Sequence, residues 1–206
     1  MCFGSDLCSC RIYLPMKGSE AQKSLLRKRM ILKRKGMTIS EIEEKSAVIC
    51  RRVLANEQFA YAGNVLLYLP VGGEVDTKCL LAHFQKKKAG VFLPAYFKEE
   101  KKWIISKFEG LDNLKAGPFG IMQPREATIP LLPSLGLAIV PIVAFSPELD
   151  RLGWGKGVYD RLLGKFKTTK VGLAYESQMV KKLFTAPHDI KMDCVVTEKK
   201  IYGKIV

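Results

Sequence analysis

Short apolar runs that alternate with helix-like segments constrain the fold of this chain more than any other feature. Five such runs occur, at residues 65–69, 91–93, 137–145, 171–174 and 194–196. Their length and their content of Val, Ile and Leu are typical of buried strands. Because helical patterns and short connections separate them, the sequence predicts a three-layer α/β/α fold with a mostly parallel central sheet. Ligands of such sheets bind outside the carboxyl ends of the strands, so the loops there are candidate sites.

Two helices are predicted before the first strand, over residues 20–35 and 40–56, and together they would form an N-terminal helical hairpin. In the first helix, Leu25 and Leu32 mark an apolar side, whereas Lys23 and Arg27 share a basic face one turn apart. The residue pairs that fit capping boxes at the two helix starts are Ser19–Gln22 and Ser40–Glu43.

The remaining segments are less regular. Residues 102–108 alternate enough to form a strand, expected at an edge of the sheet, and residues 202–206 are expected to close a small hairpin. Pro141, inside the run 137–145, implies a bulge or a break in pairing. A weak helix is predicted near residues 177–184.

Length and composition are those of a single globular domain, predicted over residues 16–206. Residues 1–15 read as a disordered tail or an over-extended start, because Met16 heads a helix-like sequence. Three of the six cysteines lie in the first ten residues and the other three are scattered, which fits reduced thiols in a cytoplasm. With no C-x-x-C pair and only two histidines, the sequence argues against a zinc site. No apolar run reaches the ~18 residues of a membrane span, and the start lacks the pattern of a signal peptide.

The net charge of +14 is concentrated near the start of the chain. Residues 17–52 hold eleven Lys or Arg against four Glu, a net +7. Such a segment could bind a nucleic-acid backbone or a polyanionic small molecule such as ATP, or could be a solvated basic face. A nucleic-acid-binding module is therefore the alternative function, although residues 17–56 contain no aromatic side chain for base stacking.

A glycine-rich loop at residues 151–161 is the strongest candidate for chemistry. It follows the run 137–145 and precedes a helical pattern, which predicts a strand, a loop and a helix start. Glycines there let a ligand approach the backbone N–H groups, and the basic side chains favour phosphate. Asp160 is an acid beside a phosphate site, so it suggests Mg²⁺. The spacing matches neither the P-loop nor the dinucleotide motif, and an ordinary glycine-rich turn is the plain alternative.

The strand-end argument gathers further polar groups at the same edge of the sheet. These are Glu74, the glycine-rich loop, Tyr175 and residues 188–193, and Lys23 and Arg27 could reach this edge from the first helix. Asp160 and Asp193 are predicted to share one magnesium ion. Taken alone, Glu74 favours an exposed charge at the start of the helix predicted over residues 77–87, with a ligand-facing acid as the alternative. No protein nucleophile is evident, so the residues favour ATP-dependent chemistry that works by positioning and electrostatics.

Several segments together resemble the 5-formyltetrahydrofolate cyclo-ligase family over roughly residues 19–200. The segment Arg151-Leu-Gly-Trp-Gly-Lys-Gly-Val-Tyr-Asp-Arg161 is similar to the family signature. Lys23-Ser-Leu-Leu-Arg27 resembles the family's ATP-contacting helix, and the segments 117–121 and 188–198 also resemble family segments. Many members carry Tyr or Phe at the position of Trp154, and a second aromatic residue at the position of Val158. A sugar-phosphate isomerase or an acyl-CoA transferase of related fold is the alternative within enzymes, but these need no ATP.

The resemblance implies conversion of 5-formyltetrahydrofolate to 5,10-methenyltetrahydrofolate with ATP and Mg²⁺, through a phosphorylated formyl group, by a cytoplasmic monomer. The resemblance fits folate substrates both with and without a polyglutamate tail. It implies folate contacts at Leu69, Glu74 and residues 154–158, and magnesium at Asp160 and Asp193. Lys156 and Arg151 would act on the transferring phosphoryl group. The implied ATP contacts are Lys23, Arg27, Arg151, Leu152, Gly153, Trp154, Gly155, Lys156, Gly157, Val158 and Tyr159.

Overall fold

A computed structural model of the chain describes residues 20–126 and 134–204. The helices are α1 (Glu20–Lys35), α2 (Ile39–Leu54), α3 (Glu57–Ala60), α4 (Lys78–Lys86) and α5 (Val158–Leu163). The strands are β1 (Asn64–Leu66), β2 (Gly90–Phe97), β3 (Lys102–Lys107), β4 (Leu114–Ala116), β5 (Met122–Pro124), β6 (Leu137–Pro141), β7 (Ala144–Phe145), β8 (Arg151–Leu152), β9 (Thr169–Leu173), β10 (Cys194–Val196) and β11 (Ile201–Gly203). The predicted cap at Ser19, the tail 1–15 and the last two residues of the predicted hairpin lie outside the described residues.

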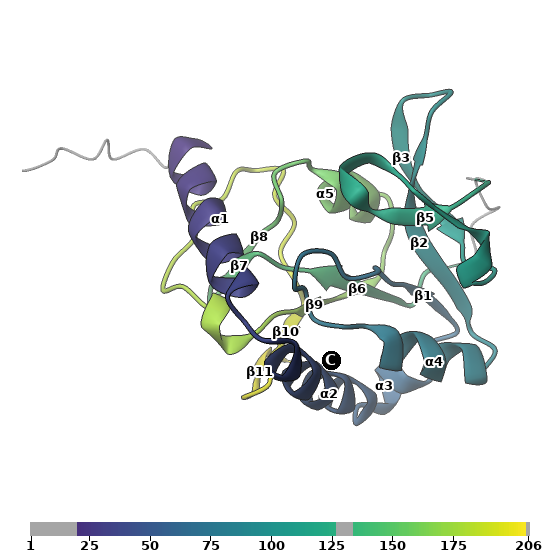
Figure 1. Ribbon diagram of the computed structural model, residues 1–206, viewed down its shortest axis with the longest axis horizontal. Coiled ribbons are helices and arrows are strands. Elements are labelled where there is room, and N and C mark those ends of the chain that lie inside the picture. The colour runs from purple at the N-terminus through teal and green to yellow at the C-terminus, as the bar shows by residue number, and fades with distance from the viewer. Residues whose placement is uncertain (1–19, 127–133, 205–206) are drawn as a thin grey trace, which may run out of the picture.

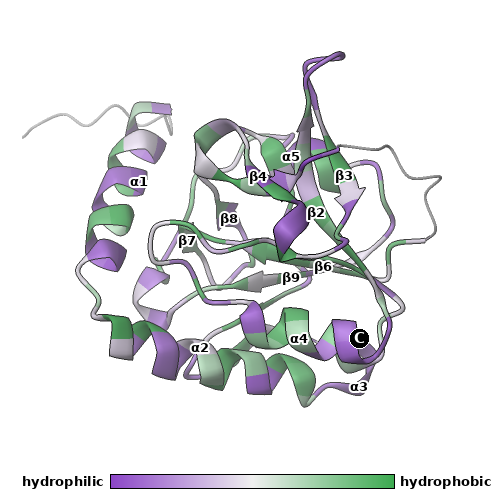
Figure 2. Cartoon of the chain, turned by 45° about the vertical axis from the view of Figure 1, so that its right-hand side comes forward, coloured by the Kyte–Doolittle hydropathy of each residue, from purple (hydrophilic) through white to green (hydrophobic). Residues whose placement is uncertain are grey.

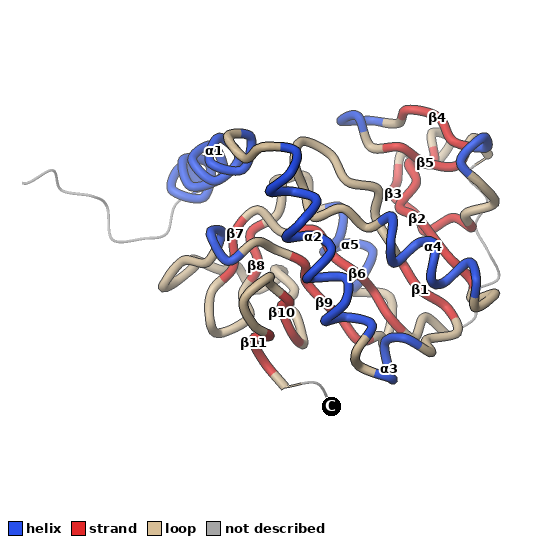
Figure 3. The backbone as a smooth tube through the Cα atoms, turned by 60° about the horizontal axis from the view of Figure 1, so that its bottom comes forward, coloured by secondary structure: helices blue, strands red, loops and turns tan. Residues whose placement is uncertain are grey.

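A seven-stranded sheet in the order β11-β10-β9-β6-β1-β2-β3 forms the centre of the domain. The five inner strands run parallel, and only β3 and β11 at the two edges pair antiparallel. Helices α2, α3 and α4 cover one face of the sheet and α5 lies on the other (Figure 1), and Figure 3 looks onto the α2–α4 layer. The predicted α/β fold with a mostly parallel sheet is therefore confirmed, as is the edge position of β3.

The strands and helices meet in one apolar core. Leu66 of β1, Ile139 of β6 and Val171 of β9 have no exposed surface. Figure 2 shows apolar and polar residues interleaved along α2 and α4, as expected for helices that bury one face against a sheet. No helix in residues 20–126 and 134–204 is long and apolar enough to cross a membrane.

Helix α1 has the predicted extent, whereas α2 spans Ile39–Leu54 in place of residues 40–56. The capping box of α2 is formed by Thr38 and Glu41, not by the predicted pair Ser40–Glu43. The arrangement of the two helices also differs from the prediction. After Gly36 the helices diverge, so α2 packs under the sheet while α1 stands at its margin (Figures 1 and 2). The chain therefore does not form a closed helical hairpin.

The orientation of α1 also differs from the prediction. Leu25 and Leu32 are each 70% exposed, whereas Met30 and Arg34 are buried. The apolar side chains expected to face the core point outward, because the basic face of α1 turns toward the protein. This inversion places the charges of α1 beside the polar end of the sheet.

The run 137–145 forms two strands in place of one. β6 ends at Pro141, and β7 then pairs antiparallel with β8 in a separate two-stranded ribbon. Proline has no N–H to continue the ladder, so the predicted break in pairing falls at this residue. The ribbon leads directly from the end of β6 into the glycine-rich loop. Farther along, the predicted helix 177–184 is reduced to one 3-10 turn at Glu176–Gln178.

Candidate active site

A cavity of about 780 Å³ opens at the carboxyl ends of β1 and β6. Tyr68 and Leu69, which follow β1, and Pro141, the last residue of β6, form its floor. Residues from α1, from the β4–β5 hairpin, from the glycine-rich loop and from the segment before β10 complete the wall. The cavity brings together every predicted ATP-binding and folate-binding residue: Lys23, Arg27, Leu69, Glu74 and residues 151–159.

The glycine-rich loop has the predicted succession of strand, loop and helix. β8 ends at Leu152 and α5 begins at Val158, with Gly155 at φ +82° and Gly157 at φ +60°. Glycine adopts such φ values without steric cost. The Arg27 side chain of α1 braces the loop, because its Nε donates to the carbonyl oxygen of Gly153 at 3.0 Å. Helix α1 is therefore hydrogen-bonded directly to the glycine-rich loop.

Asp160 lies in the first turn of α5, directly after this loop, and is paired with a buried arginine. Arg151 Nη2 donates to Asp160 Oδ1 at 2.6 Å, and the backbone N–H of Ile190 donates to the same oxygen at 3.3 Å. The Arg151 side chain is 4% exposed, and that of Asp160 is 21% exposed. Within residues 20–126 and 134–204, Asp160 Oδ2 makes no hydrogen bond or ion pair, so it remains available to a ligand.

Lys156 and Phe119 face each other across the mouth of the cavity. The Lys156 ammonium lies 4.8 Å from the centroid of the Phe119 ring, a cation–π distance. Phe119 is held at φ +63°, in the β4–β5 hairpin, and is exposed. In the described part of the chain Lys156 has no carboxylate partner, so its charge is free to meet an anion.

The structure does not bring Asp193 to Asp160. Asp193 Oδ2 accepts from the backbone N–H of Lys170 at 2.7 Å and lies 2.9 Å from the Lys170 ammonium. It lines a separate cavity of about 490 Å³. β10 begins at residue 194, so Asp193 lies at the amino end of the parallel strands, opposite the candidate site. The predicted pairing of Asp160 and Asp193 around one metal is wrong for this reason.

Asp189, and not Asp193, lies in the main cavity with Asp160. It lines the main cavity, and its Oδ2 accepts from Lys23 Nζ at 2.6 Å and from the N–H of Ala186 at 2.8 Å. Partial burial opposes its ionisation, but these hydrogen bonds outweigh burial and hold the pKa of Asp189 below its ordinary value. Asp189 could have been identified from the sequence, because it belongs to the polar segment 188–193 that was predicted to lie at this edge of the sheet.

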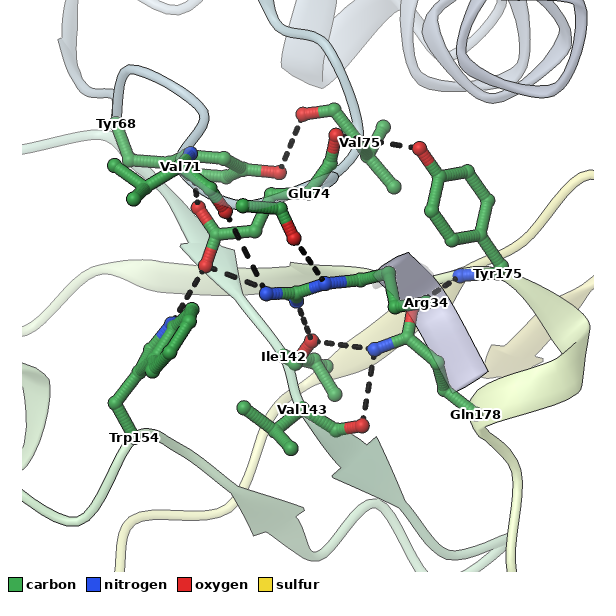
Figure 4. A network of polar contacts seen from close by, with 11 residues as sticks. Arg34, Tyr68, Val71, Glu74, Val75, Ile142, Val143, Trp154, Tyr175 and Gln178 are labelled. Carbon is green, nitrogen blue, oxygen red and sulfur yellow. Dashed lines mark hydrogen bonds and ion pairs between the residues drawn. The ribbon is translucent and has the colours of Figure 1, made fainter. Parts of the chain in front are cut away.

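Glu74 is buried at the opposite side of the cavity, so its reading as an exposed helix-start charge is wrong. It is 6% exposed. Trp154 Nε1 donates to its Oε1 at 2.7 Å, and the N–H of Val71 donates to its Oε2 at 3.1 Å (Figure 4). Burial raises the pKa of the Glu74 carboxyl, and Arg34, Trp154 and the Val71 N–H lower it by a smaller amount.

Arg34, Tyr68 and Tyr159 lie around this carboxylate, and Tyr175 contacts the backbone of Glu74. The sequence places Arg34 on the same side of the first helix as Lys23 and Arg27 but predicts no role for it in the site. In the structure it is 2% exposed and lies 3.9 Å from Glu74 Oε1. Tyr68 and Tyr159 line the cavity and are buried. Tyr175 does not line the cavity; its hydroxyl donates to the backbone carbonyl of Glu74 at 3.2 Å. Arg34 lies eleven residues after Lys23, on the same helical face, which is the signal that could have identified it.

The fold and this cavity define an α/β enzyme whose site combines a basic, glycine-rich half with a buried acidic recess. A model of the 5-formyltetrahydrofolate cyclo-ligase family matches residues 19–198. The chain belongs to this family.

Individual relatives agree with the family assignment. A probable 5-formyltetrahydrofolate cyclo-ligase of Schizosaccharomyces pombe is 29% identical over 181 residues, covering 80% of this chain and 89% of the relative. The 5-formyltetrahydrofolate cyclo-ligase of Escherichia coli K12 is 28% identical over 176 residues, covering 82% and 97%. The solved structure of Aquifex aeolicus 5,10-methenyltetrahydrofolate synthetase superposes with a TM-score of 0.77 at 34% identity, covering 89% of this chain and 95% of that one. The recognition made from the sequence motifs is confirmed.

Proposed function

We propose that this chain converts 5-formyltetrahydrofolate to 5,10-methenyltetrahydrofolate, using ATP and releasing ADP and phosphate. The observation that carries the proposal is the division of one cavity into two chemically different halves. Lys23, Arg27 and the glycine-rich loop supply the positive charge and backbone N–H groups that suit a triphosphate. Glu74 supplies a buried carboxylate that suits the N–H groups of a pterin ring.

The ATP half is proposed to comprise Lys23, Arg27 and residues 151–159. Gly155 and Gly157 keep the backbone open to the phosphates, and Arg27 fixes the loop. Lys156, which is exposed at the mouth, is placed to approach the outermost phosphate. Arg151 is nearly enclosed and paired with Asp160, so its proposed part is to hold that carboxylate in place.

Magnesium fits this half of the cavity, with Asp160 and Asp189 as the residues that would hold it. Asp160 offers Oδ2, and Asp189, one residue before the Ile190 N–H that contacts Asp160, offers Oδ1. Protein-bound Mg²⁺ commonly takes one or two carboxylates and completes its shell with substrate phosphates and water. When bound, it would neutralise charge on the triphosphate. The proposal replaces Asp193 with Asp189.

The folate half is proposed to comprise Leu69, Glu74 and residues 154–158. Trp154 presents an indole ring at the border between the two halves, and Val158 is buried beside it in the cavity wall. An amide oxygen is a poor leaving group, so the formyl oxygen first attacks the γ-phosphorus and ADP leaves. N10 then attacks the activated carbon, loses its proton and expels phosphate. Lys156 and the loop N–H groups stabilise charge on the transferring phosphoryl group.

We also propose that the chain acts as a monomer in the cytoplasm, as one domain over residues 16–206. Among the described residues, Cys50, Cys79 and Cys194 are free thiols, which supports a reducing compartment. The proposed substrate is 5-formyltetrahydrofolate with or without a polyglutamate tail. Oligonucleotide binding is expected only as weak electrostatics, because Lys23 and Arg27 are directed into the cavity.

A calorimetric titration with Mg·ATP, with and without 5-formyltetrahydrofolate, tests the proposed function together with the near-ultraviolet absorbance of the methenyl product. We expect both ligands to bind at one site each, and product to form only when both are present. Product formation without ATP, or no folate binding at any ATP concentration, would refute the proposal.

A further inference from the structure

A buried arginine lies directly behind the carboxylate of the folate recess. Arg34 reaches from α1 with a side chain that is 2% exposed, and its Nη1 lies 3.9 Å from Glu74 Oε1. Its guanidinium carbon lies 5.2 Å from the centroid of the Trp154 ring. Figure 4 shows Glu74 between this guanidinium and the indole N–H. One cation thus touches both side chains that form the recess.

The same guanidinium also ties together the two strand ends beneath the recess. Its Nε donates to the carbonyl oxygen of Gly72 at 3.0 Å, in the loop after β1. Its Nη1 donates to the carbonyl oxygen of Ile142 at 3.4 Å, just after β6. These bonds fix the orientation of the fork, so the charge behind Glu74 has a defined position. A lysine ammonium could not reproduce that planar geometry.

Within the residues that the structure describes, Arg34 is the only formally charged side chain that acts on Glu74 among those packed against it. The other titratable groups facing this site are Tyr68 after β1, Tyr159 of α5 and Tyr175 after β9, and all three are neutral at neutral pH. Burial raises the pKa of each of these phenols. A buried carboxylate without a cation tends to take up a proton, so the charge of Glu74 depends on Arg34.

Glu74 has unused acceptor capacity toward the cavity. A carboxylate can accept about four hydrogen bonds. Within the described part of the chain it accepts one on each oxygen, from Trp154 Nε1 and from the N–H of Val71. One acceptor position on each oxygen therefore remains, which matches a ligand edge that carries two adjacent N–H donors.

We infer that Arg34 is a positioning residue that keeps Glu74 ionised and aimed into the recess, so that the recess selects a heterocycle edge with two adjacent N–H donors. This inference rests on the proposed function, in which the pterin edge is that ligand. Arg34 does not touch the substrate; it acts through Glu74. A protonated or displaced Glu74 would offer a donor and would lose its preference for such an edge.

A double-mutant cycle between Arg34 and Glu74 tests whether the effect passes through the carboxylate. Binding of 5-formyltetrahydrofolate is measured by calorimetry for wild type, Arg34→Gln, Glu74→Gln and the double variant. We expect Arg34→Gln to weaken folate binding roughly ten- to hundredfold, in line with loss of a charged hydrogen-bond partner. In the Glu74→Gln background the same change is expected to cost less than about threefold. Arg29→Gln, which removes an exposed charge from the same helix, is the matched control.

The pH dependence of folate binding separates this role from a merely structural one. Binding requires the carboxylate, so it is lost as the pH falls through the pKa of Glu74. Removal of Arg34 raises that pKa, so the loss begins at higher pH in Arg34→Gln than in wild type. Arg34→Lys keeps the charge, so its acid limb should stay near that of wild type although its affinity falls.

Each outcome decides the inference. An equal loss in both Glu74 backgrounds, or an acid limb in Arg34→Gln that coincides with that of wild type, overturns it. If Arg34→Gln does not fold, Arg34→Lys carries the test: an acid limb shifted upward in that variant overturns the inference, and an unshifted limb with weaker folate binding supports it. Failure of the wild-type chain to bind folate would refute the proposed function. Folate binding by the wild-type chain without coupling between Arg34 and Glu74 in the double-mutant cycle would refute only the role of Arg34.

Discussion

Replacement of Gly155 by alanine should damage the ATP half of the cavity through a contact that the structure defines. A Cβ at this position would lie 3.0 Å from Cζ of Arg27 and 3.1 Å from its Nε, and the residue sits at φ +82°. The backbone strain of such a residue costs about 1–2 kcal/mol. Relief of the clash moves the Arg27 guanidinium by a few tenths of an ångström, which weakens its hydrogen bond to the Gly153 carbonyl oxygen. The intact charged hydrogen bond is worth about 1.5–3 kcal/mol, so its weakening costs a fraction of that.

These two costs appear in different measurements. The strain lowers thermal stability, and the shifted guanidinium raises the KM for Mg·ATP by up to roughly tenfold, with a smaller change in the KM for folate. Steady-state assays of methenyl product and thermal melts follow the two effects. Gly120→Ala is the matched control for strain, because Gly120 has φ +74° and its new Cβ would meet no atom of the described residues within 4 Å. The reasoning fails if Gly155→Ala keeps the wild-type KM for ATP and melts no lower than Gly120→Ala.

Four further changes test the arrangement of the carboxylates and the basic helix. Asp160→Asn is expected to reduce product formation about a hundredfold or more, since it removes a carboxylate from the phosphate half and leaves Arg151 buried without its partner; activity near wild type would contradict this. Asp193→Asn should leave turnover close to wild type, whereas Asp189→Asn should reduce it. The opposite ranking would favour Asp193, and not Asp189, as the partner of Asp160. The depressed pKa of Asp189 contributes stability that is present above the ordinary pKa of aspartate and lost as the pH falls through the folded value, so melts of wild type and Asp189→Asn should converge at the acid end. Lys23→Ala should raise the KM for ATP more than that for folate, and a larger effect on folate would count against its assignment.

Local patterns were sufficient to predict the sheet and the loop. The apolar runs became β1, β2, β6, β9 and β10, and the glycines at 155 and 157 fell where the backbone needs positive φ. Pro141 was expected to interrupt pairing, and β6 ends there. These features depend on residues close together in sequence, where steric rules and strand propensity act directly.

The misassigned features depend on distant parts of the chain. Asp189 and Asp193 belong to one polar segment, and only the starting residue of β10 decides which of them faces the cavity. The spacing of Leu25 and Leu32 predicted an apolar side of the helix, but both side chains are exposed and Arg34 is buried. Arg34 is buried because its guanidinium contacts a backbone carbonyl oxygen and a carboxylate that lie far from it in sequence. The burial of Glu74 could not be predicted for the same reason, because no local pattern indicates that the indole N–H of Trp154 donates to its carboxylate.

Helix α1 meets the cavity at three successive points along one face: Lys23 at Asp189, Arg27 at the glycine-rich loop and Arg34 behind Glu74. Lys23 and Arg34 are eleven residues apart, about 16 Å of a continuous helix. A rod fixed at both ends cannot tilt at one end without moving the other. If this chain binds ATP and folate as proposed, we expect the two affinities to be coupled through α1. Such coupling is reciprocal: the factor by which ATP changes the affinity for folate must equal the factor by which folate changes the affinity for ATP.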